Sequence, residues 1–210
     1  MDPNFWLQKW ELGETRFHEG QANGLLVEHF DALSLKPDSR VFLPLCGKTR
    51  DIHWLLSKGM RVSGAELSVL AIEQLFAELG VTPEITPVGA LRRYSADGID
   101  IFVGDIFELT RAALGPVDAI YDRAALVALP QPMRDRYAPH LVEITVRAPQ
   151  LLICFEYDQS LVDGPPFSIG AAEVDRLYRD TYVLTALETA DVPGGLKGIC
   201  PAQETIWLLR

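Results

Sequence analysis

Gly47 and Glu66 have the residue types and spacing of a nucleoside-binding site. Gly47 follows a short apolar run, residues 40–45, and Glu66 follows a second one, residues 61–65, about 20 positions further along. In doubly wound folds, a glycine lets the first strand-to-helix turn approach the ligand, and an acidic residue at this spacing accepts hydrogen bonds from ribose hydroxyls. The alternative is that Glu66 is an ordinary solvated residue at the end of a strand.

The turn between these residues, PLCGKT at 44–49, limits the kind of ligand. It matches neither G-x-G-x-x-G nor a Walker loop, and it therefore lacks the glycines with which a backbone cradles a pyrophosphate. An adenosyl ligand without phosphates suits this turn better than NAD. S-adenosylmethionine is the leading candidate.

Further candidate residues follow two later apolar runs. Asp105 and Ile106 come after one run, and Asp122 and Arg123 end the next. Parallel sheets place ligands at the carboxyl ends of their strands, so these residues are expected beside a bound ligand. Asp105 is equally well placed to cap a helix, and Asp122 is expected either to orient Arg123 or to be structural. A surface ion pair between Asp122 and Arg123 would contribute little.

The elements that must position these residues alternate between strands and helices. Buried strands are expected at residues 40–45, 61–65, 99–103, 116–121 and 149–157. Amphipathic helices are expected over residues 21–35 and 131–142, and from the caps Thr49 and Ser68. A further helix is expected to begin at Ser168 and Glu173. Residues 82–97, which prolines interrupt, read as a surface connection. Two alternating stretches, 181–189 and 205–209, predict an antiparallel hairpin at the edge of the sheet.

This pattern predicts an α/β fold with a doubly wound, mostly parallel seven-stranded sheet and an antiparallel C-terminal hairpin. The 210 residues are expected to form a single domain, with residues 1–35 as an N-terminal helical lid. Trp6 and Trp10 are four positions apart, so one helical turn would place both rings on the same face. Simple packing on the core is the alternative for Trp6.

Several stretches in chain order resemble the thiopurine S-methyltransferase family, in its bacterial form. They are FWLQKWELGETRFHEG at 5–20, VFLPLCGKTRDIHWL at 41–55, VSGAELS at 62–68 and YDRAALVALP at 121–130. The match extends through most of residues 5–160 and is looser beyond. The resemblance implies the class I methyltransferase fold, S-adenosylmethionine as cofactor, and a thiopurine-type sulfur acceptor.

The resemblance also implies roles for individual residues. Arg123 is expected to be catalytic and to favour an anionic acceptor, with acceptor contacts from Trp6 and Phe17. Cofactor contacts are expected from Trp10, Leu45, Gly47, Glu66, Asp105, Ile106 and Arg123. Some family members, the animal ones in particular, carry a second arginine near the C-terminal hairpin. Here the comparable stretch offers only Lys197, which supplies charge without a planar bidentate grip. Resemblance to bacterial members adds selenium and tellurium compounds as acceptors.

Composition excludes several other classes of protein. A net charge of −10 argues against a nucleic-acid partner, and no apolar run approaches the length that spans a bilayer. The N-terminus lacks the pattern of a signal peptide. The three cysteines, Cys46, Cys154 and Cys200, include no C-x-x-C pair, which indicates a reducing cytoplasm and no zinc cluster. We expect a cytoplasmic, monomeric protein without a metal site.

Two other functional classes remain open at this level. One is a nucleotide-dependent oxidoreductase, against which the missing G-x-G-x-x-G and the predicted hairpin argue. The other is a non-catalytic sensor of an adenosyl ligand, against which the aromatic N-terminal segment and Arg123 argue. Methyl transfer to a thiolate needs little acid or base help, because positioning and desolvation supply most of the rate. The lack of an obvious catalytic dyad is therefore compatible with an enzyme.

Overall fold

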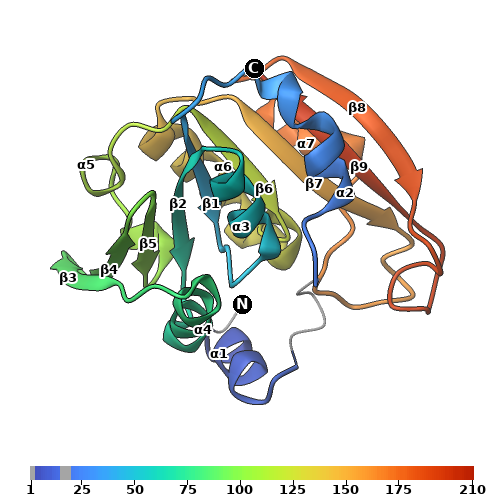
Figure 1. Ribbon diagram of the computed structural model, residues 1–210. Helices are drawn as coiled ribbons and strands as arrows, with labels where there is room; N and C mark the ends of the chain where they lie inside the picture. The colour runs from blue at the N-terminus through green and yellow to red at the C-terminus, as the bar shows by residue number, and fades with distance from the viewer. Residues whose placement is uncertain (1–2, 15–19) are drawn as a thin grey trace.

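The computed structural model describes residues 3–14 and 20–210 and is built on one continuous nine-stranded sheet (Figure 1). The strand order is β3-β4-β5-β2-β1-β6-β7-β9-β8. The five central strands run parallel: β1 (Arg40–Pro44), β2 (Arg61–Glu66), β5 (Ile99–Val103), β6 (Ala119–Arg123) and β7 (Gln150–Tyr157). β9 (Ala202–Leu209) and β8 (Leu184–Asp191) continue the sheet antiparallel. The predicted parallel core and C-terminal hairpin are confirmed.

The sheet has two more strands than the seven expected. Residues 82–97 do not form a surface connection but a hairpin of β3 (Glu84–Val88) and β4 (Leu91–Ala96), and β4 pairs antiparallel with β5. Pro87 made this stretch look unlike a strand. A proline is tolerated here because β3 lies at the edge of the sheet, where one side of the strand has no partner to supply with an N–H donor.

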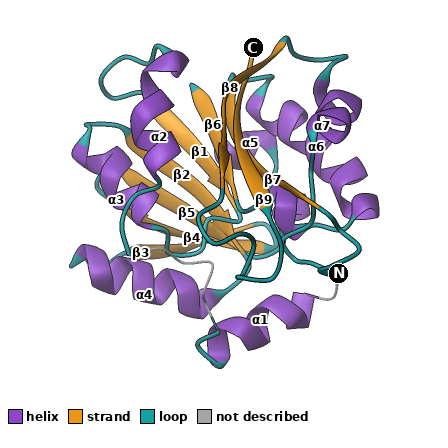
Figure 2. Ribbon diagram, turned by 90° about the vertical axis from the view of Figure 1, so that its right-hand side faces the viewer, coloured by secondary structure: helices purple, strands orange, loops and turns teal. Residues whose placement is uncertain are grey.

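Helices cover both faces of the sheet (Figure 2). α2 (Gly24–His29), α3 (Arg50–Ser57) and α4 (Val69–Leu79) lie on one face, and α5 (Arg111–Leu114), α6 (Gln131–Thr145) and α7 (Ala171–Tyr178) lie on the other. Each face buries its own apolar cluster against the strands. This doubly wound arrangement is the predicted one. No helix in residues 3–14 and 20–210 has the length and apolar character needed to cross a bilayer.

The two predicted helix caps, Thr49 and Ser68, are confirmed. The Thr49 hydroxyl accepts from the backbone N–H of Asp51, and that of Ser68 accepts from Ala71. We expected a helix to begin at Ser168, but its hydroxyl instead accepts from the N–H of Tyr157 and donates to the carbonyl of Tyr157. The helix begins three residues later, so Ser168 ties the preceding loop to β7.

The N-terminal part of the chain is helical but interrupted. The helix predicted over residues 21–35 is divided into α2 and a 3₁₀ turn, Phe30–Leu33, with Leu26 and Leu33 buried. α1 (Pro3–Glu11) precedes it and stands apart from the sheet faces in both views (Figures 1 and 2). Phe17, predicted to contact the acceptor, lies outside the described residues.

Candidate active site

A cavity of about 1160 Å³ opens at the carboxyl ends of the parallel strands. It exceeds the roughly 300–1,000 Å³ common for small-molecule sites, so it has room for a nucleoside cofactor and a second molecule. All predicted site residues within the described ranges line it: Trp6, Trp10, Leu45, Gly47, Glu66, Asp105, Ile106 and Arg123. The fold thus brings these residues together, and their individual roles stay predictions.

Glu66 is not the solvated strand-end residue of the alternative reading. Its carboxylate is buried and accepts two backbone hydrogen bonds, from the N–H of Gly47 at 2.8 Å and from that of Ser68 at 2.8 Å. Burial raises the pKa of Glu66, while the two N–H donors act in the opposite direction. A carboxylate has about four lone-pair sites, so its oxygens can accept further bonds from hydroxyls in the cavity.

The turn after β1 is covered by the buried ring of Trp10. Gly47 has φ +52°, and a Cβ atom placed on it would lie 3.0 Å from Cζ2 of Trp10. The position therefore favours glycine both for its backbone conformation and for the close approach of the indole. Trp6, one turn earlier in α1, lines the same cavity and stacks edge-to-face on Phe5 with ring centroids 5.2 Å apart.

Asp105 and Ile106 follow the carboxyl end of β5. The side chain of Asp105 accepts from the N–H of Phe107 at 3.0 Å and so caps the short 3₁₀ helix Ile106–Glu108. The capping role is confirmed, and because Asp105 also lines the cavity, a ligand contact remains a prediction. Ile106 is buried and contributes an apolar wall.

Arg123 faces a buried carboxylate that the sequence did not single out, that of Asp51. Nη1 of Arg123 lies 3.8 Å from Oδ2 of Asp51, and their side chains are 11% and 1% exposed. Asp51 also accepts from the N–H of Asn23 at 2.7 Å and from the hydroxyls of Thr49 and Tyr121 at 3.0 and 3.2 Å. The carboxylate of Asp51 therefore links the guanidinium of Arg123 to α3, and its bond with Tyr121 also fixes it to β6. Its place in the first turn of a predicted helix was the one available signal.

Asp122 has the structural role rather than the orienting one. It is fully buried and accepts from the N–H of Leu126 at 3.0 Å and from the hydroxyl of Tyr137 at 2.7 Å. Burial raises its pKa to about 6. Neighbouring residues in a strand point to opposite faces, so Asp122 and Arg123 address different sides of the sheet.

Part of the cavity wall comes from the C-terminal half of the chain. Gly164, Pro165 and Pro166 line the cavity together with Lys197 from the β8–β9 connection. The ammonium of Lys197 donates to the carbonyl of Pro165 at 2.8 Å, which joins the two loops. The two residues are 32 positions apart in the chain, and no local sequence pattern predicts their contact.

Relatives that are similar over nearly the whole chain share one family name. The family model described as Thiopurine S-methyltransferase (TPMT) matches residues 1–207. A thiopurine S-methyltransferase of Xanthobacter autotrophicus is 62% identical, with 100% of this chain and 99% of the relative covered. Another, from Gluconobacter oxydans, is 51% identical over 97% of this chain and 92% of the relative.

Solved structures with the same fold are more distant in sequence. A SAM-dependent methyltransferase of Anabaena variabilis superimposes with a TM-score of 0.64 at 16% identity, covering 99% of this chain and 95% of its own. The 1,6-didemethyltoxoflavin-N1-methyltransferase of Burkholderia thailandensis, solved with S-adenosylhomocysteine, gives 0.66 at 15% identity, covering 99% and 86%. Fold, cavity and relatives agree: the chain belongs to the thiopurine S-methyltransferase family and is an S-adenosylmethionine-dependent methyltransferase.

Proposed function

We propose that this enzyme transfers the methyl group of S-adenosylmethionine to the sulfur of a flat, thiopurine-type heteroaromatic thiol, and that selenium and tellurium compounds are further acceptors. The observation that carries the proposal is the placement of Arg123. Its cationic side chain is 11% exposed and lies in a cavity whose other walls are largely apolar and aromatic. The names of the relatives support the same acceptor class.

The residues around the turn after β1 fit the cofactor. When bound, S-adenosylmethionine supplies a methyl group on a sulfonium, which a nucleophile removes by in-line displacement. The buried carboxylate of Glu66 offers acceptors for ribose hydroxyls, beside the turn at Gly47 that the indole of Trp10 covers. Ile106 offers an apolar surface for the adenine ring, with Asp105 at its rim.

Arg123 acts on the acceptor through its charge. A fixed cation in a partly desolvated site lowers the pKa of a nearby thiol and so increases the thiolate fraction. Because the carboxylate of Asp51 lies 3.8 Å from the guanidinium, the charge keeps a defined position when the acceptor arrives. Positioning of this kind supplies the larger part of the rate when the leaving group needs no acid.

The indoles of α1 exclude water from the reacting atoms. Trp10 closes over Gly47, and Trp6 extends the aromatic wall toward the rest of the cavity. Removing water strengthens the interaction between Arg123 and an anionic sulfur. Residues 1–35 would then act as a lid, within a single domain that we expect to be monomeric and cytoplasmic, without nucleic-acid or membrane partners.

Calorimetric titration with S-adenosylhomocysteine, with NADH in parallel, tests the cofactor. We expect micromolar binding of the first ligand and none of the second. A methyl-transfer assay with a thiopurine and with selenite then tests the acceptor. Binding without transfer to either acceptor would favour the sensor function, and a preference for NADH would favour the oxidoreductase.

A further inference from the structure

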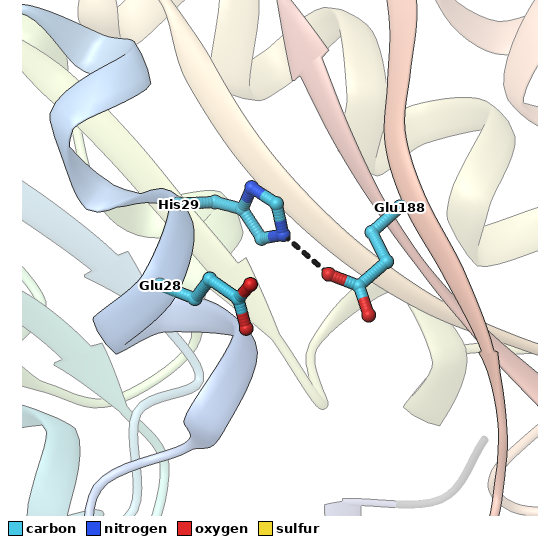
Figure 3. Close-up of side chains that lie close together, drawn as sticks. All are labelled: Glu28, His29 and Glu188. Atoms are coloured by element: carbon cyan, nitrogen blue, oxygen red, sulfur yellow. Dashed lines mark hydrogen bonds and ion pairs between the residues drawn. The ribbon is translucent and has the colours of Figure 1, made fainter.

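A cluster of metal-ligand side chains lies outside the cavity, where α2 approaches β8. Glu28 and His29 end α2, and Glu188 comes from β8 (Figure 3). Each offers one ligand atom, and these atoms all lie within 4.8 Å of one another. None of the three residues lines the cavity described above. The cluster is therefore not explained by methyl transfer.

The fold positions this cluster in a defined way. Nε2 of His29 lies 2.7 Å from Oε2 of Glu188, and the side chains are 20% and 36% exposed. The pairing of β8 with β9 shifts register between Ala186 and Glu188, and such an irregularity re-aims the side chain beside it. Figure 3 shows the carboxylate of Glu28 below the imidazole of His29, with the carboxylate of Glu188 to the right of the ring.

The negative charges of the cluster favour a bound cation. Two carboxylates, from Glu28 and Glu188, approach one imidazole on a chain whose net charge is already −10. Like charges at this separation repel unless a positive charge lies between them. A divalent ion between the three side chains would balance both carboxylates.

We propose that Glu28, His29 and Glu188 bind one divalent transition metal ion of the zinc type. Imidazole nitrogen with carboxylate oxygens is a ligand set for zinc-like ions rather than for magnesium. Three protein ligands leave a position for water. The ion replaces the hydrogen bond between His29 and Glu188 and fastens α2 to the edge strand. The sequence predicted no metal site, because the two ligating segments are 159 positions apart.

Metal binding to the full chain, stripped with a chelator, tests the proposal. Titration with Zn²⁺ should show one equivalent bound, and Mg²⁺ should not compete. Zn²⁺ should also raise the melting temperature, because an ion that binds only the folded state stabilises it. The Glu28→Gln and Glu188→Gln variants should bind at least about tenfold more weakly. Glu143→Gln, which removes a charge from an exposed position of α6, should bind as the parent does.

Glu28→Gln separates a metal site from a simple ion pair. The hydrogen bond drawn in the cluster joins His29 to Glu188, so this variant removes a ligand and leaves that bond in place. Unchanged Zn²⁺ affinity in Glu28→Gln would overturn the proposal, as would the lack of a bound equivalent in the parent. Co²⁺ should give an absorption spectrum without thiolate charge transfer, and a thiolate band would assign the ion to a cysteine instead.

Discussion

The guanidinium of Arg123 lies 3.8 Å from the carboxylate of Asp51, although the two residues are 72 positions apart and belong to different strand–helix units. The pair is nearly withdrawn from water and lies at the cavity. Because Asp51 is also held by Asn23 and Tyr121, it transmits a fixed position to the cation. Arg123 therefore depends on α3 as well as on its own strand.

Asp51→Asn should reduce kcat by about tenfold to a hundredfold, because a small displacement of a positioned group has effects of this size. Affinity for S-adenosylhomocysteine should change much less. Steady-state kinetics with a thiopurine measure the first quantity, and calorimetry the second. Tyr121→Phe is the matched control, since it removes one hydrogen bond to Asp51 and keeps the charge pair. An equal loss of kcat in both variants would contradict the positioning role.

Arg123→Ala should lower turnover more than it lowers stability. The substitution removes the positive charge that favours the thiolate, so the apparent pKa of the acceptor in the pH–rate profile should rise. That displacement distinguishes an electrostatic role from a structural one. A variant with full activity and an unchanged profile would make Arg123 structural.

Glu66→Ala should weaken binding of S-adenosylhomocysteine by about 1–3 kcal/mol, the range for a lost charge-assisted hydrogen bond. The free energy of unfolding should also fall, because the N–H groups of Gly47 and Ser68 lose their acceptor. Calorimetry at a temperature where the variant is folded isolates the first effect. Glu73→Gln on the exposed side of α4 controls for loss of charge. Unchanged affinity would remove the ribose assignment.

Gly47→Ala and Gly59→Ala form a matched pair. Both glycines have positive φ, +52° and +74°, but a Cβ at Gly47 meets Trp10 while one at Gly59 meets nothing within 4 Å. Each substitution should cost about 1–2 kcal/mol of stability from backbone conformation. Gly47→Ala alone should weaken cofactor binding, because the indole must move. Equal binding by both variants would show that Trp10 does not control this turn.

The free energy of unfolding should depend on pH because of the titration of Asp122. Its pKa is raised from 3.8 to about 6 by burial, so the protonated form is favoured in the folded state. The stabilisation that protonated Asp122 gives the folded state is fully present below pH 3.8 and is lost as the pH rises through about 6. The difference corresponds to about 3 kcal/mol. Denaturant unfolding of the parent and of Asp122→Asn should be measured at several pH values across this range. The free energy of unfolding of the variant should increase relative to that of the parent as the pH rises. A constant difference would refute the assignment.

Much of the fold could be predicted from local pattern. The parallel strands, the caps Thr49 and Ser68 and the C-terminal hairpin follow from apolar runs, capping hydroxyls and alternation, which depend on near neighbours in sequence. The β3–β4 hairpin was missed because Pro87 is acceptable only at an edge, and the position of a strand in a sheet is set by tertiary contacts.

The sequence predicted individual residues of the candidate site but not the contacts between them. Glu66 and Gly47 were found by their spacing, and the structure adds a direct hydrogen bond between them. The Asp51–Arg123 pair and the contact between Lys197 and Pro165 join segments far apart in the chain. No spacing rule encodes such contacts, because the intervening elements decide which side chains meet.

Both outer strands of the sheet are poor templates for a further strand. β3 carries Pro87, which has no N–H to donate, and β8 is interrupted by its register shift and bears the charged Glu188. Prolines, irregularities and charges at sheet edges hinder edge-to-edge pairing between molecules. A nine-stranded sheet with open ends is exposed to fibre-like aggregation, and these edge features protect it when the protein is concentrated.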